Sequence, residues 1–309
     1  MQIWALIVDS FRESLDRKIF WVMLVISLAV AAAMFGFSFE PNRINVLFGT
    51  WSIESDLFTI GGAIRTDLIA SIIVEWIADV VLGSVGIFLA LIATAGFFPA
   101  MMERGGIEVL LSKPFPRWKL VLGKYIGSLT FMAVQAAIFV ALTFLVAGFR
   151  WNVWLPRYFL VIPLMILMFS YLYSVSTLVA VYTRSTVTVI LITMFAWIGF
   201  TGVQSMGDYF EMYPELREYR SAYNGLRVAR WIVPKTSDLT LLARKWTRSA
   251  SPTDFVTDAD EKGRDMIDRA EKAERLRLDL NPAATIGSSL LFEAAVLMIA
   301  IWKFSRKDF

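Results

Sequence analysis

Six apolar runs with few or no charged side chains recur along this 309-residue chain, and they limit what it can fold into more than any other feature. Each run is long enough to cross the hydrocarbon core of a bilayer as one helix, which takes about 20 residues. We therefore predict an all-α polytopic membrane protein with six transmembrane helices. The predicted spans are residues 19–37, 78–99, 121–147, 157–182, 187–204 and 285–303.

The composition agrees with a bilayer as the solvent and removes several kinds of chemistry. The chain is 57% hydrophobic with a mean hydropathy of +0.60, which is more apolar than a usual soluble protein. It contains no cysteine and no histidine, which excludes disulfides, thiolate metal sites and a Ser-His triad. Because no metal-ligand cluster or nucleophile–base pair emerges, we predict that the chain is not an enzyme and binds no metal or cofactor. Its basic residues are too dispersed for nucleic-acid binding.

Residues 3–18 precede the first span and have a helical periodicity of their own. The pattern predicts an amphipathic elbow helix that lies in the membrane interface and begins a transmembrane domain of residues 1–204. A solvated leader helix is the alternative, and it is less favoured because a span follows at once. No small-residue cleavage pattern follows the first span, so we expect it to be retained. The apolar positions are Trp4, Ile7, Val8, Phe11 and Leu15.

The distribution of Lys and Arg predicts that both termini are cytoplasmic and that the protein lies in the cytoplasmic (inner) membrane. In that orientation twelve cations lie on the inside and four lie in short outer loops, in agreement with the positive-inside rule. The inside cations are Arg12, Arg17, Lys18, Arg104, Lys113, Arg117, Lys119, Lys124, Arg184, Lys303, Arg306 and Lys307. The outer cations are Arg43, Arg65, Arg150 and Arg157.

Residues 205–284 form a long polar segment, which we predict to be an extracytoplasmic, partly helical loop. It holds fourteen Lys and Arg and fourteen Asp and Glu, and long loops translocate largely regardless of charge. Within it, residues 258–280 read as a charged helix that is either solvated or docked on its own protein or on an extracytoplasmic partner. Residues 229–246 are amphipathic, broken by proline, and expected to pack back on the membrane surface. Residues 285–309 supply the last span and a cytoplasmic tail.

The loop between the second and third predicted spans combines glycines, a short helical segment, two prolines and several cations. Glu103-Arg104-Gly105-Gly106 is polar and flexible, and Ile107 to Ser112 can form a short helix. Lys113-Pro114-Phe115-Pro116 ends that helix, because proline disfavours helix before it and cannot continue one. The product is a short helix at about residues 103–112 that faces the cytoplasm, is fixed at both ends, and can be gripped by a soluble partner.

This order of residues resembles the corresponding loop of ABC-2 type transporter permeases. The family pattern contains an acidic–basic pair, Gly-Thr, an acidic residue, Leu-Leu-Ser, a basic residue with Pro, then an Arg and Gly-Lys. The matching residues of this chain are Glu103, Arg104, Gly106, Glu108, Leu110, Leu111, Ser112, Lys113, Pro114, Arg117, Gly123 and Lys124. Ile107 departs from the pattern where Thr is usual. The long loop before the last span looks most like that of permeases of the copper-enzyme-maturation type.

The resemblance implies a partner and a mechanism. Such permeases are dimers of six-helix halves, and each half engages an ATP-hydrolysing subunit through a coupling helix between spans two and three. The elbow helix flanks that subunit. ATP and Mg are expected on the partner, because this chain has no G-x-x-x-x-G-K-[ST] loop. The resemblance assigns the contact with the partner to Glu103, Arg104, Gly106, Glu108, Leu110, Leu111, Lys113, Pro114 and Arg117.

The leading hypothesis is the transmembrane permease subunit of an ABC-2 type transporter, in which ATP hydrolysis by a separate subunit drives export or translocation. An alternative is a force-transmitting membrane anchor that acts on an extracytoplasmic partner through residues 205–284 and conducts no substrate. A secondary carrier or channel is disfavoured, because intramembrane charge is sparse and no internal repeat is visible.

Glu293 lies within the last predicted span, where a carboxylate is costly and suggests function. One reading is a contact with substrate, a proton or a partner in the dimer interior. The other reading is a protonated side chain, or one near a polar face that pairs with a backbone donor. The sequence alone does not decide between these two interpretations. Gln135, in the third predicted span, is expected to make one interhelical hydrogen bond.

Overall fold

The structure is a computed structural model that describes residues 18–40, 43–46, 49–54, 76–77, 80, 84–102, 116–212, 220–247 and 281–307. The described part is mainly helical, and the predicted class of polytopic helical membrane protein is confirmed. The expected elbow helix, apart from Lys18, lies outside the described residues. The expected coupling helix at 103–112 and the charged helix at 258–280 lie outside them as well.

Among the described residues, five helical segments are long and apolar enough to cross a membrane. They correspond to the first, third, fourth, fifth and sixth predicted spans. The fourth span starts with a 3-10 turn, η3, before its α-helix α8. The helices are α2 (Lys18–Gly36), α7 (Arg117–Trp151), η3 (Pro156–Leu160) with α8 (Val161–Thr183), α9 (Thr186–Met212) and α13 (Pro282–Ser305).

The second predicted span is described only in part, as two shorter helices. They are α4 (Gly86–Thr94) and α5 (Phe97–Met101). The helix is interrupted between them at Ala95 and Gly96, just before Pro99. Pro99 has no N–H to donate to the preceding turn, and its ring disfavours a regular helix there, which accounts for the break. Both short helices pack against α8.

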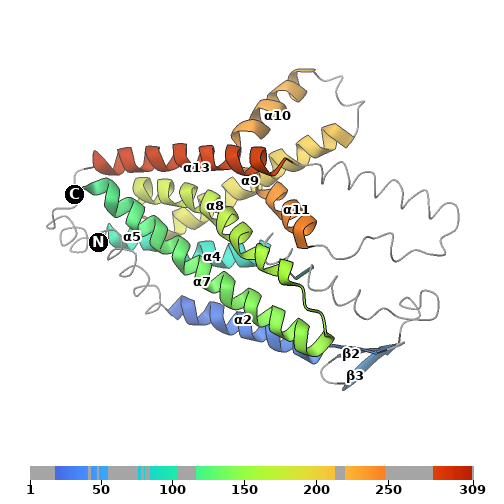
Figure 1. The fold of residues 1–309 in the computed structure, drawn as a ribbon. Helices are drawn as coiled ribbons and strands as arrows, with labels where there is room; N and C mark the ends of the chain where they lie inside the picture. The colour runs from blue at the N-terminus through green and yellow to red at the C-terminus, as the bar shows by residue number, and fades with distance from the viewer. Residues whose placement is uncertain are drawn as a thin grey trace.

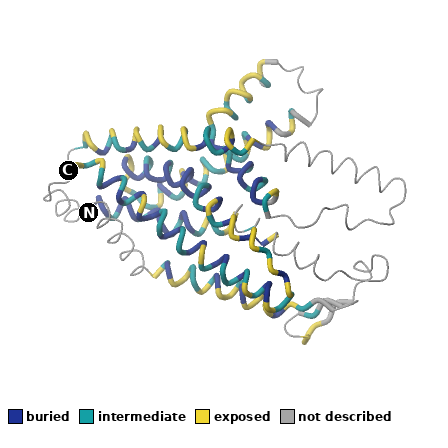
Figure 2. Tube along the Cα trace, viewed as in Figure 1, coloured by how far each residue is buried: buried dark blue, intermediate teal, exposed yellow. Residues whose placement is uncertain are grey.

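Figure 1 shows the long helices running side by side, with α13 along one side of the bundle and α2 along the other. α8 lies centrally and contacts α7, α9 and α13, whereas α2 packs mainly on α7. Figure 2 shows the consequence for burial, since α8 is dark along most of its length while α9 and α13 are largely exposed. In the most apolar stretch of each helix, 67% of the α8 residues are buried, compared with 11% for α9 and 17% for α13. The exposed faces of α9 and α13 are apolar, as lipid contact requires.

The two ends of the bundle differ. At one end, which we call the sheet end, α2 leads into a three-stranded antiparallel sheet of β1 (Ser38–Glu40), β2 (Arg43–Val46) and β3 (Trp51–Glu54), in the order β1-β2-β3. Hydropathy did not predict these strands. Arg150 Nε and Trp151 Nε1, at the end of α7, donate hydrogen bonds to the carbonyl oxygens of Phe35 and Phe37 at 3.2 and 3.1 Å. The opposite end, where α13 stops, is called the tail end.

Two further helices follow α9, and one of them enters the bundle. They are α10 (Arg220–Ile232), which projects from the side of α9 in Figure 1, and α11 (Thr236–Thr247). Between them, the backbone N–H of Lys235 donates to Ser289 Oγ at 3.0 Å. Ser289 is seven residues into α13, or about 10 Å along the helix. The turn therefore lies beside the second turn of α13, and the predicted packing on the membrane surface stays a prediction.

The burial of α11 supports that placement. Leu239, Leu242 and Ala243 are at most 3% exposed, and α11 contacts α8, α9 and η3. The fifth helix also continues to Met212, beyond the predicted end of its span at 204. The stretch from 205 to 284 that we expected outside the membrane thus begins as a continuation of α9. It also sends α11 into the bundle, and the domain division itself stays a prediction.

Gly148 in α7 provides a test of the packing at the sheet end. A Cβ atom at this position would lie 2.6 Å from ring carbons of Trp154, so the indole would have to leave its present contacts with Phe144 and Phe149. We expect Gly148→Ala to destabilise the protein by about 1–3 kcal/mol, as overpacking does. The measurement is thermal unfolding of the purified protein in detergent.

Gly199→Ala is the matched control for that variant. It makes the same change in the spanning helix α9, where no atom lies within 4 Å of the added Cβ. Alanine favours helix over glycine, so this variant should be neutral or slightly stabilising. Equal melting temperatures for the two variants would contradict the described contact between Gly148 and Trp154.

Candidate functional site

Of the residues assigned to the ATPase contact, the structure describes Arg117. The other eight lie outside the described residues, and their role stays a prediction: Glu103, Arg104, Gly106, Glu108, Leu110, Leu111, Lys113 and Pro114. Arg117 is the first residue of α7 and follows Pro116, which has an extended backbone with φ −64° and ψ 135°. The predicted coupling segment therefore leads within a few residues into the third span.

Arg117 binds the end of α13. Its Nη1 donates hydrogen bonds to the carbonyl oxygens of Ser305 at 3.0 Å and Lys307 at 2.7 Å. Ser305 is the last residue of α13, and the last carbonyls of a helix have no partner within the helix. A guanidinium at this place satisfies those acceptors and interacts favourably with the negative end of the helix dipole. The start of α7 and the end of α13 are thus joined.

Lys307 extends the connection to α8. Its Nζ donates to the carbonyl oxygen of Val181 at 2.6 Å, in the last turn of α8. Burial lowers the pKa of Lys307 below that of an ordinary lysine, and the positive charges of Arg184 and Lys303 lower it further. We call the set of Arg117, Val181, Ser305 and Lys307 the tail clasp, because it holds α7, α8 and α13 together at the tail end.

A second group of contacts surrounds Glu293, half-buried in the middle of α13. Tyr125, in α7, donates its hydroxyl to Glu293 Oε1 at 2.8 Å, and Ser170, in α8, donates to Glu293 Oε2 at 2.9 Å. Both donors are buried, at 3% and 4% exposed. We call Tyr125, Ser170 and Glu293 the carboxyl site. It joins the same three helices as the tail clasp, but at the middle of their length.

Stacked aromatic rings fix the position of Tyr125. Its ring stacks on Tyr173 with centroids 5.5 Å apart, and Tyr173 stacks in turn on Phe169 at 5.1 Å. The Tyr173 hydroxyl lies 2.7 Å from Ser128 Oγ in α7. The carboxyl site is therefore built on packed helices, with each hydroxyl held in place by its neighbours. Such support keeps the donors at hydrogen-bond distance from Glu293.

Sequence reasoning identified Glu293 and did not identify its partners. Tyr125 and Ser170 precede Glu293 by 168 and 123 residues. Serine and tyrosine are common in apolar helices, and no spacing within one helix relates these residues to Glu293. One of the alternatives left open was pairing with a backbone donor; among the described residues, side-chain hydroxyls take that place. The proposed roles of Glu293 in binding a substrate or a partner stay predictions.

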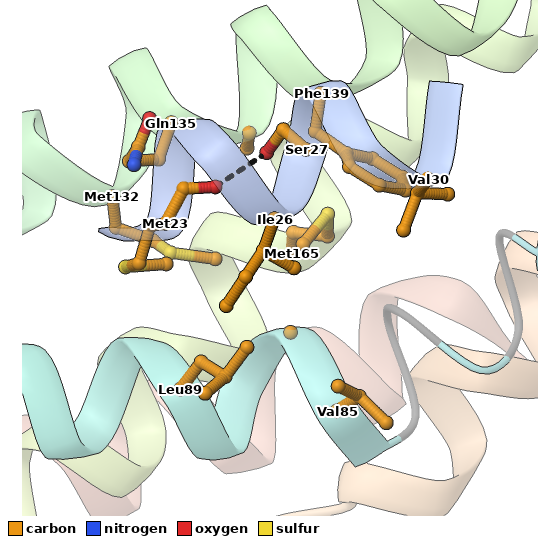
Figure 3. A pocket seen from close by; sticks show the side chains of 12 residues that line it. Met23, Ile26, Ser27, Val30, Val85, Leu89, Met132, Gln135, Phe139 and Met165 are labelled. Atoms are coloured by element: carbon orange, nitrogen blue, oxygen red, sulfur yellow. Dashed lines mark hydrogen bonds between the residues drawn. The ribbon is translucent and has the colours of Figure 1, made fainter. Parts of the chain in front are cut away.

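Gln135 makes the interhelical hydrogen bond that was expected of it. Its Nε2 donates to the carbonyl oxygen of Phe20 in α2 at 3.2 Å. Gln135 also lines a cavity of about 70 Å³ among α2, α4, α7 and α8, shown in Figure 3. The other lining side chains are almost all apolar, and the Ser27 hydroxyl donates to the Met23 carbonyl within its own helix. Gln135 Oε1 is buried without a hydrogen-bond partner among the described residues, and the rest of the lining favours apolar contents, because a water molecule needs several polar partners.

The described residues offer no metal centre. No group of three or more His, Cys, Asp or Glu side chains comes together in the part of the chain that the structure describes. The described geometry does provide a mechanical connection between helices and one ionisable group. The tail clasp can transmit a displacement between helices, and the carboxyl site holds one ionisable group between three of them. The tail clasp and the carboxyl site are the two candidate functional features.

The hydroxyl of Tyr125 can be tested by its removal. Tyr125→Phe keeps the ring stack on Tyr173 and leaves Glu293 Oε1 without its hydroxyl partner. We expect a loss of stability of about 1 kcal/mol, the usual size for a hydrogen bond between membrane helices. Tyr182→Phe removes a hydroxyl from an exposed side chain of α8 and should change the melting temperature little. A larger effect at Tyr182 than at Tyr125 would contradict the described site.

The tail clasp predicts a change in the reactivity of Lys307. Replacing Arg184 by Asn removes a positive charge near Lys307, so the pKa of Lys307 should rise toward that of an ordinary lysine. At a fixed alkaline pH a larger fraction of Nζ is then protonated, and acylation of this amine slows. Asn suits position 184, because Arg184 has φ 53° and Asn tolerates the left-handed region.

Mass spectrometry of peptides from the labelled full-length protein measures this rate. Arg157→Asn is the control, because it removes one positive charge at the sheet end, away from Lys307. It should leave the acylation rate of Lys307 unchanged. If Arg184→Asn gives the same rate as the control, the charge of Arg184 does not act on Lys307 and the described electrostatics of the tail clasp are wrong.

Comparison with known proteins gives one family for nearly the whole chain. A family model described as "ABC-2 family transporter protein" matches residues 4–309. The match covers the five long spans, both candidate features and the predicted elbow and coupling segments. Curated protein sequences give no match. The family match therefore identifies the class of protein. The contacts described above are the basis for a proposed mechanism.

Proposed function

The chain belongs to the ABC-2 transporter family, and from this premise we propose that ATP hydrolysis in a separate subunit drives export or translocation through it. The chain is then the membrane component of an ABC transporter, without an ATP site of its own. ATP and Mg would be bound by the partner, which is an ATP-binding cassette subunit. The assignment to the copper-enzyme-maturation type stays a prediction.

The tail clasp is the observation that carries this proposal. The predicted coupling segment ends just before Arg117, and Arg117 Nη1 is bound to the end of α13. A push on the coupling segment is therefore applied to the start of α7 and, through the tail clasp, to α13 and α8. A helix end held by hydrogen bonds from a charged group resists separation, because breaking them exposes unpaired carbonyls. Motion in a soluble partner thus has a route into the bundle.

The positions of the cations support an orientation in which the tail end of the bundle faces the cytoplasm. The cations that sequence analysis assigned to the inside gather there among the described residues, at the start of α7 and the ends of α8 and α13. Lys303 lies 5.2 Å from the ring centroid of Tyr182, and Arg306 lies 4.4 Å from that of Trp302. This is the pattern expected for side chains at a membrane–water boundary next to the cytoplasm. The termini and the ATPase subunit would then be on the same side.

A second copy of the chain is part of the proposal. The resemblance to permeases that work as dimers motivates it, and the exposed apolar faces of α9 and α13 offer surface for it. Those faces are equally suited to lipid, so their exposure does not choose between the two. Chemical cross-linking of the protein in its native membrane measures the state directly, and a product of twice the chain mass supports the dimer.

The experiment that tests the proposed function is co-purification with the ATPase subunit. The tagged chain is isolated from its native membrane, and mass spectrometry identifies the proteins that come with it. We expect an ATP-binding cassette protein among them. Glu103→Lys and Glu108→Lys should each reduce its recovery about tenfold or more, because reversing a charge at an interface typically costs over 1.4 kcal/mol.

Glu274→Lys is the matched control, since it reverses the same charge in the predicted charged helix on the other side of the membrane. It should leave the recovery of the ATP-binding cassette protein unchanged. Absence of any such protein from the wild-type preparation would refute the proposed function. Normal recovery with both Glu103→Lys and Glu108→Lys would refute the role of these two residues and leave the family unaffected.

A further inference from the structure

The carboxyl site contains more acceptor oxygens than its two hydroxyl groups can serve. The Tyr125 hydroxyl oxygen lies 2.8 Å from Glu293 Oε1 and 2.8 Å from the Ser170 carbonyl oxygen. Ser170 Oγ lies 2.9 Å from Glu293 Oε2 and 2.8 Å from the Leu167 carbonyl oxygen. Each hydroxyl carries one proton, whereas a carbonyl or an ionised carboxylate only accepts. Two protons are thus available for four short oxygen–oxygen contacts.

A proton on Glu293 removes part of this deficit. If Oε1 carries the proton, it donates to the Tyr125 oxygen, and the tyrosine proton is free to bind the Ser170 carbonyl. If Oε2 carries it, it donates to Ser170 Oγ, and the serine proton is free to bind the Leu167 carbonyl. In either arrangement three of the four contacts have a proton. With an ionised carboxylate, two contacts bring lone pairs together at hydrogen-bond distance, which is unfavourable.

In the part of the chain that the structure describes, Glu293 has no cationic partner. Its hydrogen-bond partners among the described residues are the two hydroxyls of the carboxyl site. The described groups on neighbouring helices that can ionise near it are tyrosines, Tyr125 of α7 and Tyr171 of α8. Lys235, before α11, reaches Ser289 one helical turn away, through its backbone N–H. A carboxylate in the middle of a span without a cation is costly, so a neutral acid is the favoured form.

Other charged groups on the elements around α13 are engaged elsewhere. Arg230 of α10 donates from Nε to Gln204 Oε1 in α9 at 3.3 Å. Lys124, next to Tyr125 in α7, places its Nζ 6.0 Å from the ring centroid of Phe97. Asp238 lies in the first turn of α11 and is buried there, and the spanning part of α9 (186–207) contains no charged residue. These contacts leave the two hydroxyls as the groups that hold the Glu293 carboxyl.

We propose that the carboxyl site is a proton-binding site: Glu293 holds a proton while α13 packs on α7 and α8, and exchanges it with water from the sheet end. The step is simple, since the carboxylic acid gives its proton to a water molecule and becomes a carboxylate. The proton site does not depend on the proposed ATP-driven function. Use of the site during transport does rest on that function, because separation of α13 from α7 and α8 would remove the partners of the acid.

The direction of exchange follows from the polarity of α13. Toward the sheet end, the face that carries Glu293 continues with Ser289 and Thr285, at 0% and 2% exposed. Toward the tail end, it continues with the buried apolar residues Val296, Ala300 and Phe304. A proton can pass along hydroxyls and water and cannot pass through packed hydrocarbon. The polar side chains therefore lie between the carboxyl site and the sheet end, and the Ser289 hydroxyl donates to the Thr285 carbonyl at 2.9 Å.

Two buried hydroxyls mark places where water can complete that connection. The hydroxyl of Thr236 has no hydrogen-bond partner among the described residues, and that of Tyr171 lies beside Ser289 without a well-formed hydrogen bond to it; both side chains are at most 1% exposed. Tyr171 lies near both Ser289 and Glu293, and Thr236 follows the residue whose N–H binds Ser289. Buried polar groups without protein partners are usually satisfied by ordered water. Water at these hydroxyls would link Ser289 to Glu293.

Infrared spectroscopy tests the protonation of Glu293 directly. The full-length chain is purified, placed in lipid nanodiscs at neutral pH, and compared with Glu293→Gln. A protonated carboxyl group has a C=O stretching band separate from the bands of carboxylates and amides. We expect this band in the wild-type protein and its loss in Glu293→Gln. The same spectrum for both proteins in this region would overturn the proposal.

If Glu293→Gln does not fold, Tyr125→Phe provides a second infrared test of the protonation of Glu293. Loss of the hydrogen bond at Oε1 should shift the C=O band of the wild-type protein to higher frequency, because a hydrogen bond at either oxygen of a carboxylic acid weakens its C=O bond. Tyr182→Phe is the control and should leave the band in place. A band that does not respond to Tyr125→Phe comes from another carboxyl group and would overturn the assignment.

The route of exchange has its own test. On transfer to deuterated water, the acid band shifts as its proton is replaced. We expect Ser289→Ala to slow this shift severalfold relative to the wild type, while Ser288→Ala, its neighbour in α13, leaves the rate unchanged. Equal rates for Ser289→Ala and the wild type would refute the route through the sheet end. These measurements use the chain without its ATPase partner, so they can fail or succeed independently of the co-purification test.

Discussion

The position of α8 at the centre of the bundle is the constraint on which the rest of the structure depends. In lipid the hydrophobic effect does not drive one apolar helix against another, so close packing and hydrogen bonds must hold the helices together. α8 supplies both, because it buries tyrosine and phenylalanine rings together with small hydroxyl residues. Ser170 and Tyr173 connect it to α7, and Ser170 also reaches α13. The neighbouring helices are arranged around these contacts.

α13 is held at three levels by specific hydrogen bonds. The tail clasp binds its end to α7 and α8, the carboxyl site binds its middle to the same two helices, and Ser289 accepts from the turn before α11. Its remaining surface is largely exposed and apolar. A helix with a largely lipid-facing surface and several directional bonds can change position by exchanging those bonds. We therefore regard α13 as the element through which a signal from the tail end reaches the interior.

The sequence predicted the spans well because length and hydropathy are local properties. It could not predict the partners of Glu293, since Tyr125 and Ser170 come from distant helices and have no marked signal of their own. It predicted residues 229–246, which include α11, as an amphipathic stretch broken by proline that packs on the membrane surface. The described packing shows that Leu239 and Leu242 bury one face of α11 all the same. The short strands β1 to β3 have too few residues for a periodicity to be recognised.

The most direct test is the ATP-dependent distance between α4 and α13, measured by electron paramagnetic resonance in the complex with the ATPase subunit. The chain has no native cysteine, so spin labels at Phe88→Cys and Met298→Cys report on these two exposed positions alone. The account predicts that ATP shifts the distance distribution in this protein. It also predicts that the shift is abolished in those complexes that Arg117→Gln still forms with the ATPase subunit. An undiminished shift in Arg117→Gln would contradict the role of the tail clasp.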